Sequence, residues 1–218
     1  FGFIPEDHSG SPLPLQLALS RVRRGREVGL ITDAFVLESF IHSVIEGLQV
    51  QKTLSSAEGE IRFQATDHLA ALKLDQGSVI RYLSAEQSNS SVVVGGSLVL
   101  KMIRSVSGGI HPELEMGAYL TAAGYANISP LMGSVSRVDA SGTPHLLMIA
   151  QGYLNNQGDA WEWTQNNLER AIRDEMAFAH ADQGQRYDAL GELADFAAML
   201  GQRLGEMHVA LAAPRAQA

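Results

Sequence analysis

The chain has 218 residues, of which 45% are hydrophobic and 18% charged, with a formal net charge of −8 and no cysteine. This composition predicts a folded chain of one large or two small domains rather than a disordered one. The acidic balance argues against nucleic acid or an anionic membrane surface as the main partner. The lack of cysteine excludes disulfides, zinc–thiolate sites and cysteine nucleophiles. No apolar run approaches the ~18 residues that a membrane helix requires.

The chain opens on Phe-Gly-Phe-Ile, with neither a methionine nor a basic-then-apolar signal segment. A signal segment would be expected of a secreted protein. We therefore expect a cytoplasmic piece of a longer polypeptide.

The first third predicts short antiparallel strands and one helix. A polar turn at 23–26 separates two strands, and Asp33 is well placed to cap the helix that follows. The helix has apolar residues every four positions: Val36, Phe40, Val44 and Leu48. Two further strands are expected around the turn at 57–59. Over residues 1–75 we expect a small antiparallel sheet crossed by one helix.

The middle third predicts a strand-rich segment, and the last third predicts helices. Strands are expected over 78–83, 92–94, 97–104, 132–138 and 145–149. Gly95-Gly96 has the composition of a two-residue hairpin turn, and Pro112 suits the start of a short helix. Near the end of the chain, apolar residues recur at threes and fours from Leu190 to Leu211, as in an amphipathic helix. The elements together indicate an α+β fold.

Lys101 is the most informative single residue, because it lies inside the otherwise apolar strand at 97–104. Burying an amine there is unfavourable unless a carboxylate or a phosphate pairs with it. Glu115 follows on the short helix, with Glu113 as the second choice of partner. A strand lysine paired with a helix glutamate is how protein-kinase-like folds hold a lysine on nucleotide phosphates. The alternative is an edge-strand lysine that blocks aggregation.

The polar stretch at 85–91 precedes that strand, where a kinase-like fold has its phosphate-covering loop. Its candidate phosphate-binding residues are Ser88, Asn89, Ser90 and Ser91. Their hydroxyl and backbone donors can hold phosphate oxygens much as a glycine-rich loop does. The alternative is an ordinary exposed hairpin loop.

A second candidate segment is Gln151, Gly152 and Tyr153, which follow the apolar strand at 145–149. In a two-lobed kinase the hinge occupies this position. Its backbone N–H and C=O groups pair with the adenine ring. We therefore interpret these three residues as a hinge.

With these motifs in place, the sequence resembles the maltokinase family, in the form fused to trehalose synthase in bacteria. The matching stretches cover nearly the whole chain, in order: 21–25, 86–91, 98–101, 111–117, 124–127, 156–161 and 204–211. Glu-Gln-Ser-Asn-Ser-Ser at 86–91 and His-Pro-Glu-Leu-Glu-Met-Gly at 111–117 are among the specific ones.

The resemblance implies an ATP- and magnesium-dependent kinase that converts maltose to maltose 1-phosphate for glucan synthesis. It implies an antiparallel-sheet cap at 1–75, a protein-kinase-like N-lobe at 76–150, and the hinge with the first helices of a C-lobe at 151–218. Lys101 then contacts the phosphates and Glu115 orients it. The implied partners are ATP, the fused trehalose synthase (isomerase) domain and, in the full-length parent, maltose.

One departure from the family is large. The catalytic His-Gly-Asp loop and the Asp-Phe-type metal motif have no counterpart in this chain. Since phosphoryl transfer depends on a positioned base and metal ions, we expect no catalytic residue, no metal ligand and no turnover from this chain alone.

Two other functions stay open. The first is a non-catalytic, kinase-like docking module for the trehalose synthase domain, motivated by the added cap. The second is a ligand-free, cystatin-like scaffold, which requires Lys101 to be exposed and unpaired.

Overall fold

The computed structural model describes residues 1–5, 18–72, 74, 77–83, 89–156, 158–178 and 190–213, without the side chains of 175, 177 and 178. The chain divides into two compact units. The first comprises Phe1–Gly117 and Ser129–Tyr153, and the second Ala118–Ile128 and Leu154–Ala218.

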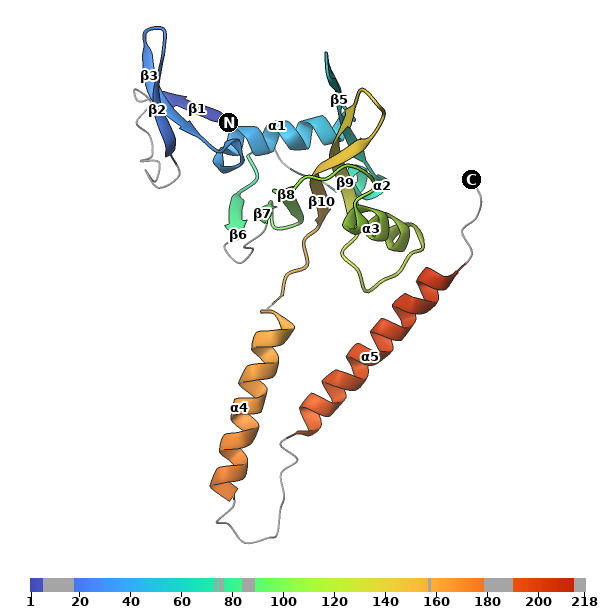
Figure 1. Ribbon diagram of the computed structural model, residues 1–218. Coiled ribbons are helices and arrows are strands. Elements are labelled where there is room, and N and C mark those ends of the chain that lie inside the picture. The colour runs from blue at the N-terminus through green and yellow to red at the C-terminus, as the bar shows by residue number, and fades with distance from the viewer. Residues whose placement is uncertain are drawn as a thin grey trace. The chain divides into compact units, whose positions relative to one another are not determined.

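The first unit contains two antiparallel sheets, one of seven strands and one of three (Figure 1). The large sheet has the order β4-β5-β9-β10-β8-β7-β6. Its strands are β4 Thr53–Ser56, β5 Gly59–Ala65, β6 Ile80–Leu83, β7 Asn89–Val94, β8 Leu98–Ile103, β9 Leu131–Asp139 and β10 Pro144–Gly152. The small sheet has the order β1-β3-β2, from β1 Gly2–Pro5, β2 Ala18–Arg24 and β3 Glu27–Thr32.

The strands around the turn at 57–59 form as predicted, but they do not join a small sheet with β2 and β3. β5 pairs with β9 along its whole length, from Gly59 opposite Asp139 to Ala65 opposite Gly133. β4 forms a hairpin with β5, so both strands belong to the seven-stranded sheet. The partner of β5 lies some 70 residues later in the sequence, and alternation within a strand does not specify such a long-range pairing.

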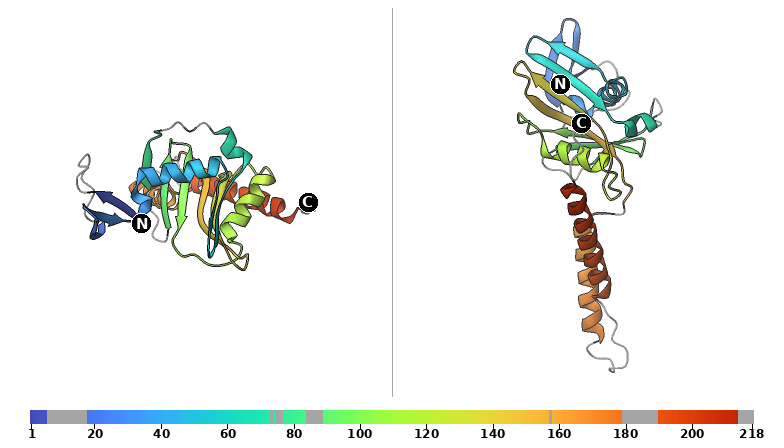
Figure 2. Two further views of the ribbon diagram at one scale, coloured as in Figure 1. Left: turned by 90° about the horizontal axis from the view of Figure 1, so that it is seen from above. Right: turned by 90° about the vertical axis from the view of Figure 1, so that its right-hand side faces the viewer.

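α1 (Glu38–Gln49) covers one face of the seven-stranded sheet (Figure 2). Asp33 does act as a cap, but for a short 3-10 helix, Ala34–Val36, where its carboxylate accepts the Phe35 N–H at 2.9 Å. Buried side chains from α1 and the sheet form one core: Ile41, Val44, Ile45, Leu48, Val92, Val94, Leu98 and Leu100.

Gly47 explains how closely α1 approaches the sheet. A Cβ at this position would lie 2.7 Å from the ring of Phe63 on β5, closer than real side-chain contacts allow. A glycine in the interior of a helix destabilises that helix by about 1 kcal/mol relative to an alanine. Here it permits the helix and the aromatic ring to pack directly.

The turn between β9 and β10 is held by the carboxylate of Asp139. Its Oδ1 accepts hydrogen bonds from the N–H of Ser141 at 2.9 Å, from the N–H of Thr143 at 3.0 Å and from the Ser141 hydroxyl at 2.6 Å. Its Oδ2 lies 3.0 Å from Nε2 of His145. The Ser141 and His145 side-chain hydrogen bonds, followed by the backbone ones, hold the pKa of Asp139 well below its usual range.

We predict that Asp139→Asn lowers the Tm at pH 7 and that this difference from the wild type shrinks in acid. A lowered pKa means that the ionised carboxylate stabilises the folded state. That contribution is complete above the unfolded-state pKa of an aspartate, about 3.9, and is lost as the pH falls toward the folded-state pKa. Thermal unfolding at pH 7, 4 and 2.5 measures the difference in Tm between the variant and the wild type. Glu58→Gln, in the exposed β4–β5 turn, is the control. A difference that stays constant across this range would contradict the prediction.

The second unit contains α4 (Ala160–Phe178) and α5 (Gly191–Ala212), together with the last residues of α3 (Pro112–Ala122) (Figure 1). The rings of Trp163 and Phe196 join α4 to α5, with centroids 4.5 Å apart. The hydroxyl of Tyr119 donates to the carbonyl of Ala210 at 3.0 Å, and that of Tyr125 to the carbonyl of Arg203 at 2.7 Å.

The apolar stripe of α5 is not buried, although its periodicity predicted the helix correctly. Leu200 and Leu204 are 55% and 48% exposed, and α5 has no buried residue among those described. On α4, Ile172 is 58% exposed. The described part of the chain therefore does not supply the surface against which these stripes pack. None of the described helices is both long and apolar enough to cross a membrane.

Candidate functional site

Lys101 lies on β8, which pairs with β10 on one side and β7 on the other. The interpretation as an edge-strand lysine is therefore wrong. Its Nζ lies 3.2 Å from Oε1 of Glu113, and its side chain is only 18% exposed. Lys101 is thus neither exposed nor unpaired, and the condition for a ligand-free scaffold is not met. Glu113, the second choice from the sequence, supplies this carboxylate, while the orienting role of Glu115 stays a prediction.

Strand register identifies which side chains share a face with Lys101. Ser91 on β7 and Ile149 on β10 lie directly opposite it, and cross-strand partners project to the same side of a sheet. Val99 is two residues away on β8 and lies opposite Val93. Around Lys101 this face, which we call the Lys101 face, carries the Ser91 hydroxyl and an apolar surface. Farther out on it, Arg81 lies opposite Val93 and Ser134 opposite Ile149. The opposite face packs against α1.

Ser91 has a buried hydroxyl without a hydrogen-bond partner in the described part of the chain. The residue is 3% exposed. Leaving such a group unsatisfied costs about 1–3 kcal/mol, so a native instance calls for an explanation such as a ligand. Its position opposite Lys101 fits an anionic ligand oxygen. His111, just before α3, likewise has a buried Nδ1 with no partner among the described residues.

Asn89 and Ser90 differ from the expected phosphate loop. Ser88 lies outside the described residues, and from Asn89 onward the segment is the strand β7 rather than a loop. The Ser90 hydroxyl accepts hydrogen bonds from Nε and Nη2 of Arg104 at 3.0 and 2.8 Å, and Asn89 Oδ1 accepts the Arg104 N–H at 3.3 Å. Arg104 also pairs with Asp33 at 2.6 Å.

These contacts give Asn89 and Ser90 a role that the sequence reasoning missed. Because side chains alternate along a strand, Ser90 and Ser91 project to opposite faces. Ser90 therefore holds Arg104, and Ser91 remains on the Lys101 face. A basic residue at the end of an apolar strand, as Arg104 is, was the available signal.

The predicted hinge residues lie at the end of β10 and just after it. The N–H of Gly152 donates to the carbonyl of Pro130 at 3.0 Å, and the N–H of Tyr153 donates to the carbonyl of Ser97 at 2.8 Å. Gln151 is still within the sheet, opposite Val99 on β8. The N–H groups of Gly152 and Tyr153 are thus engaged within the protein. Adenine pairing by this segment stays a prediction.

Asp159 caps α4. Its Oδ1 accepts the N–H of Glu162 at 2.7 Å, the pattern of a helix N-cap. Among the residues that the structure describes, no three His, Asp or Glu side chains gather into a group that could hold a metal ion.

No family model matches the sequence. The fold is nevertheless shared with sugar kinases of known structure. A glucosamine kinase in complex with glucosamine, ADP and inorganic phosphate matches with a TM-score of 0.54 and 21% identity, over 88% of this chain and 40% of that chain. Two further glucosamine kinase structures, crystal forms A and B, match with TM-scores of 0.54 and 0.52.

These likenesses establish a kinase-like fold for the chain. The crystal forms are 21% and 22% identical to it, and each match covers 88% of this chain and 39% of that chain. The chain thus spans about two fifths of the length of the structures that it matches.

Proposed function

We propose that the chain carries the nucleotide-binding part of an ATP-dependent sugar kinase. The observation that carries the proposal is the partly buried Lys101–Glu113 pair beside the unsatisfied Ser91 hydroxyl. An ammonium group binds phosphate as a point charge, and a hydroxyl donates to a phosphate oxygen. The kinase-like fold supports this assignment.

ATP fits the residues of the Lys101 face. Lys101 and Ser91 contact phosphate oxygens, Glu113 orients the lysine, and the partly exposed Val99 provides an apolar surface for the base. The nucleotide supplies the phosphoryl group when bound. The ADP in the glucosamine kinase complex supports the choice of ligand. We assign magnesium no ligand among the described residues and propose no step through it.

For the whole protein we propose maltose as the acceptor, fusion to trehalose synthase and a cytoplasmic location. These rest on the resemblance of the quoted motifs to maltokinases. In this proposal the cap comprises 1–75, the N-lobe 76–150, and the hinge with the start of the C-lobe 151–218. The exposed apolar faces of α4 and α5 are consistent with a longer kinase in which further helices cover them.

Ser91→Ala tests this proposal. Without ligand, the variant is expected to be as stable as the wild type or more stable, because it removes a buried hydroxyl that has no partner. Its affinity for ADP is expected to fall about 5- to 10-fold, the equivalent of one hydrogen bond of about 1–1.5 kcal/mol. Thermal unfolding and calorimetric titration with ADP measure the two effects.

Ser136→Ala, at another buried serine of the same sheet, is the matched control and should leave ADP affinity unchanged. Failure of ADP to bind to the chain, or unchanged affinity in Ser91→Ala, would overturn the assignment.

A second candidate function is docking of a trehalose synthase domain. Exposed apolar side chains on α4 and α5 favour it, among them Ile172, Leu200 and Leu204. If the chain is a docking module that does not bind nucleotide, the isolated trehalose synthase domain should bind it, and Leu200→Glu should weaken this binding. Titration with ADP should then give no heat of binding.

A further inference from the structure

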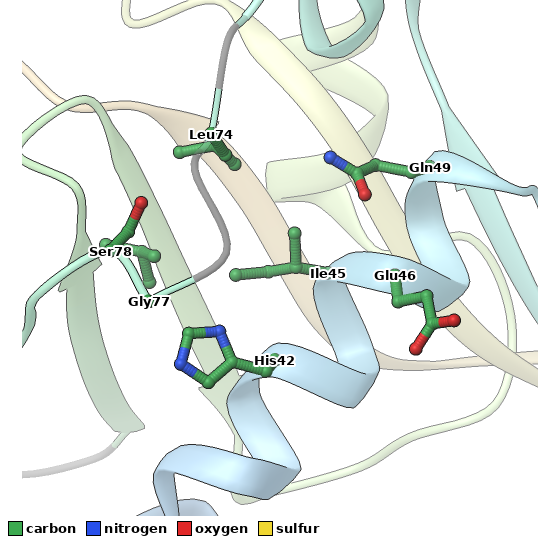
Figure 3. Close-up of a pocket in the computed structure, with 8 residues that line it drawn as sticks. His42, Ile45, Glu46, Gln49, Leu74, Gly77 and Ser78 are labelled. Carbon is green, nitrogen blue, oxygen red and sulfur yellow. The ribbon is translucent and has the colours of Figure 1, made fainter.

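A pocket of about 470 Å³ lies in the first unit, between α1 and the segment that leads into β6 (Figure 3). Its volume lies within the range of about 300–1,000 Å³ that is usual for small-molecule sites. His42, Ile45 and Gln49 project from α1 toward Leu74 and Ser78 (Figure 3). No part of the proposed nucleotide site lines this pocket.

Three polar side chains of the lining come from one face of α1. His42, Glu46 and Gln49 are spaced four and three residues apart, which brings them together on a helix surface. Within the described residues, none of these three side chains makes a hydrogen bond or an ion pair. The pocket therefore has donors and acceptors that a ligand can use.

The remaining lining defines the chemistry of that ligand. Ile45 and Val94 are buried and, with Leu74, form an apolar floor. Among the described lining residues, the polar groups are an imidazole, a carboxylate, an amide and the Ser78 hydroxyl, with no lysine or arginine. A phosphate or a nucleotide finds no cation in this described lining and meets the Glu46 carboxylate. A ring with many hydroxyl groups matches both the mixed donors and acceptors and the apolar floor.

The pocket is distinct from the Lys101 face. Val94 and Ser91 are three residues apart on β7, so their side chains project to opposite sides of the sheet. Val94 faces the α1 core, while Ser91 lies opposite Lys101. We propose that this pocket is a second binding site, which takes an uncharged mono- or disaccharide on the face of the sheet away from the nucleotide. It goes beyond the proposed kinase function and does not depend on it.

The test is a titration of the ¹⁵N-labelled 218-residue chain with glucose and with maltose, followed by amide chemical shifts in NMR spectra. We expect saturable shifts at Gln49 and Ser78 with at least one of the two sugars. The double variant His42→Leu/Gln49→Leu should weaken that binding about tenfold, since it removes two hydrogen-bonding side chains. Inorganic phosphate, used as a charged probe, should leave these amides unshifted.

Two variants serve as controls. Gln64→Leu, on the exposed side of β5, makes the same change away from the pocket and should retain full sugar affinity. Lys101→Met should also retain it, even where it abolishes ADP binding. If the double variant does not fold, Gln49→Leu at its exposed position provides the same test with a smaller effect.

Absence of binding by both sugars overturns the proposal. Unchanged affinity in the folded pocket variants also overturns it. Sugar binding that is lost in Lys101→Met but kept in the pocket variants assigns the sugar to the other face and contradicts the proposal as well.

Discussion

Replacing Lys101 by methionine is expected to weaken ADP binding by about 10- to 100-fold, because the ammonium is the cation that lies directly opposite the Ser91 hydroxyl. A hydrogen bond to a charged group contributes about 1.5–3 kcal/mol, which corresponds to that range of affinity. Methionine keeps most of the volume of the lysine side chain, so packing around β8 changes little. Calorimetric titration of the wild type and the variant with ADP measures the loss.

Three controls separate binding from folding. Lys52→Met makes the same substitution at an exposed position and should leave the affinity unchanged. Glu113→Gln keeps the ammonium and removes its ion-pair partner, so it should reduce affinity by a smaller factor. The Tm of each variant establishes that it is folded. Full ADP affinity in folded Lys101→Met would remove the basis of the proposed function.

Truncating Leu48 to alanine is expected to destabilise the first unit by about 2–5 kcal/mol, as buried leucine-to-alanine changes do. Leu48 is fully buried, and it belongs to the core that α1 and the seven-stranded sheet build together. The substitution leaves a cavity between helix and sheet. Urea unfolding followed by circular dichroism measures the change in the free energy of unfolding.

Leu54→Ala is the matched control, since Leu54 lies on β4 and is 42% exposed. A surface truncation of this kind usually changes stability by about 0.5 kcal/mol or less. Equal effects of the two substitutions would contradict the packing of α1 on the sheet.

The local elements were predictable from the sequence, because they depend on neighbouring residues. Gly95 and Gly96 both have positive φ, 58° and 65°, as predicted for a turn at this point. The connection is one residue longer than the predicted two-residue hairpin, because Val94 pairs with Leu98. The apolar period of α1 predicted its buried face in part: Val44 and Leu48 are buried, Phe40 is partly buried, and Val36 precedes the helix. Lys101 stood out for the same reason, since a single cation in an apolar strand needs a partner wherever the strand lies.

The long-range arrangement was harder to predict. Nothing in β5 itself specifies its pairing with β9, so the predicted small sheet was wrong. The pairing of Lys101 with Glu113 depends on how the first turn of α3 faces β8, which spacing alone does not determine. Asn89 and Ser90 were predicted to be loop residues because they are polar, but β7 already begins at Asn89.

The kinase proposal is tested most directly by labelling with an acyl-phosphate derivative of ATP, which transfers its acyl group to a lysine beside the bound phosphates. The chain has three lysines, Lys52, Lys73 and Lys101, so peptide mapping by mass spectrometry identifies the modified residue without ambiguity. The proposal predicts that Lys101 is acylated preferentially and that excess ADP suppresses this labelling. Equal labelling of all three lysines, or labelling of Lys101 that ADP does not reduce, would contradict a nucleotide site on this face of the sheet.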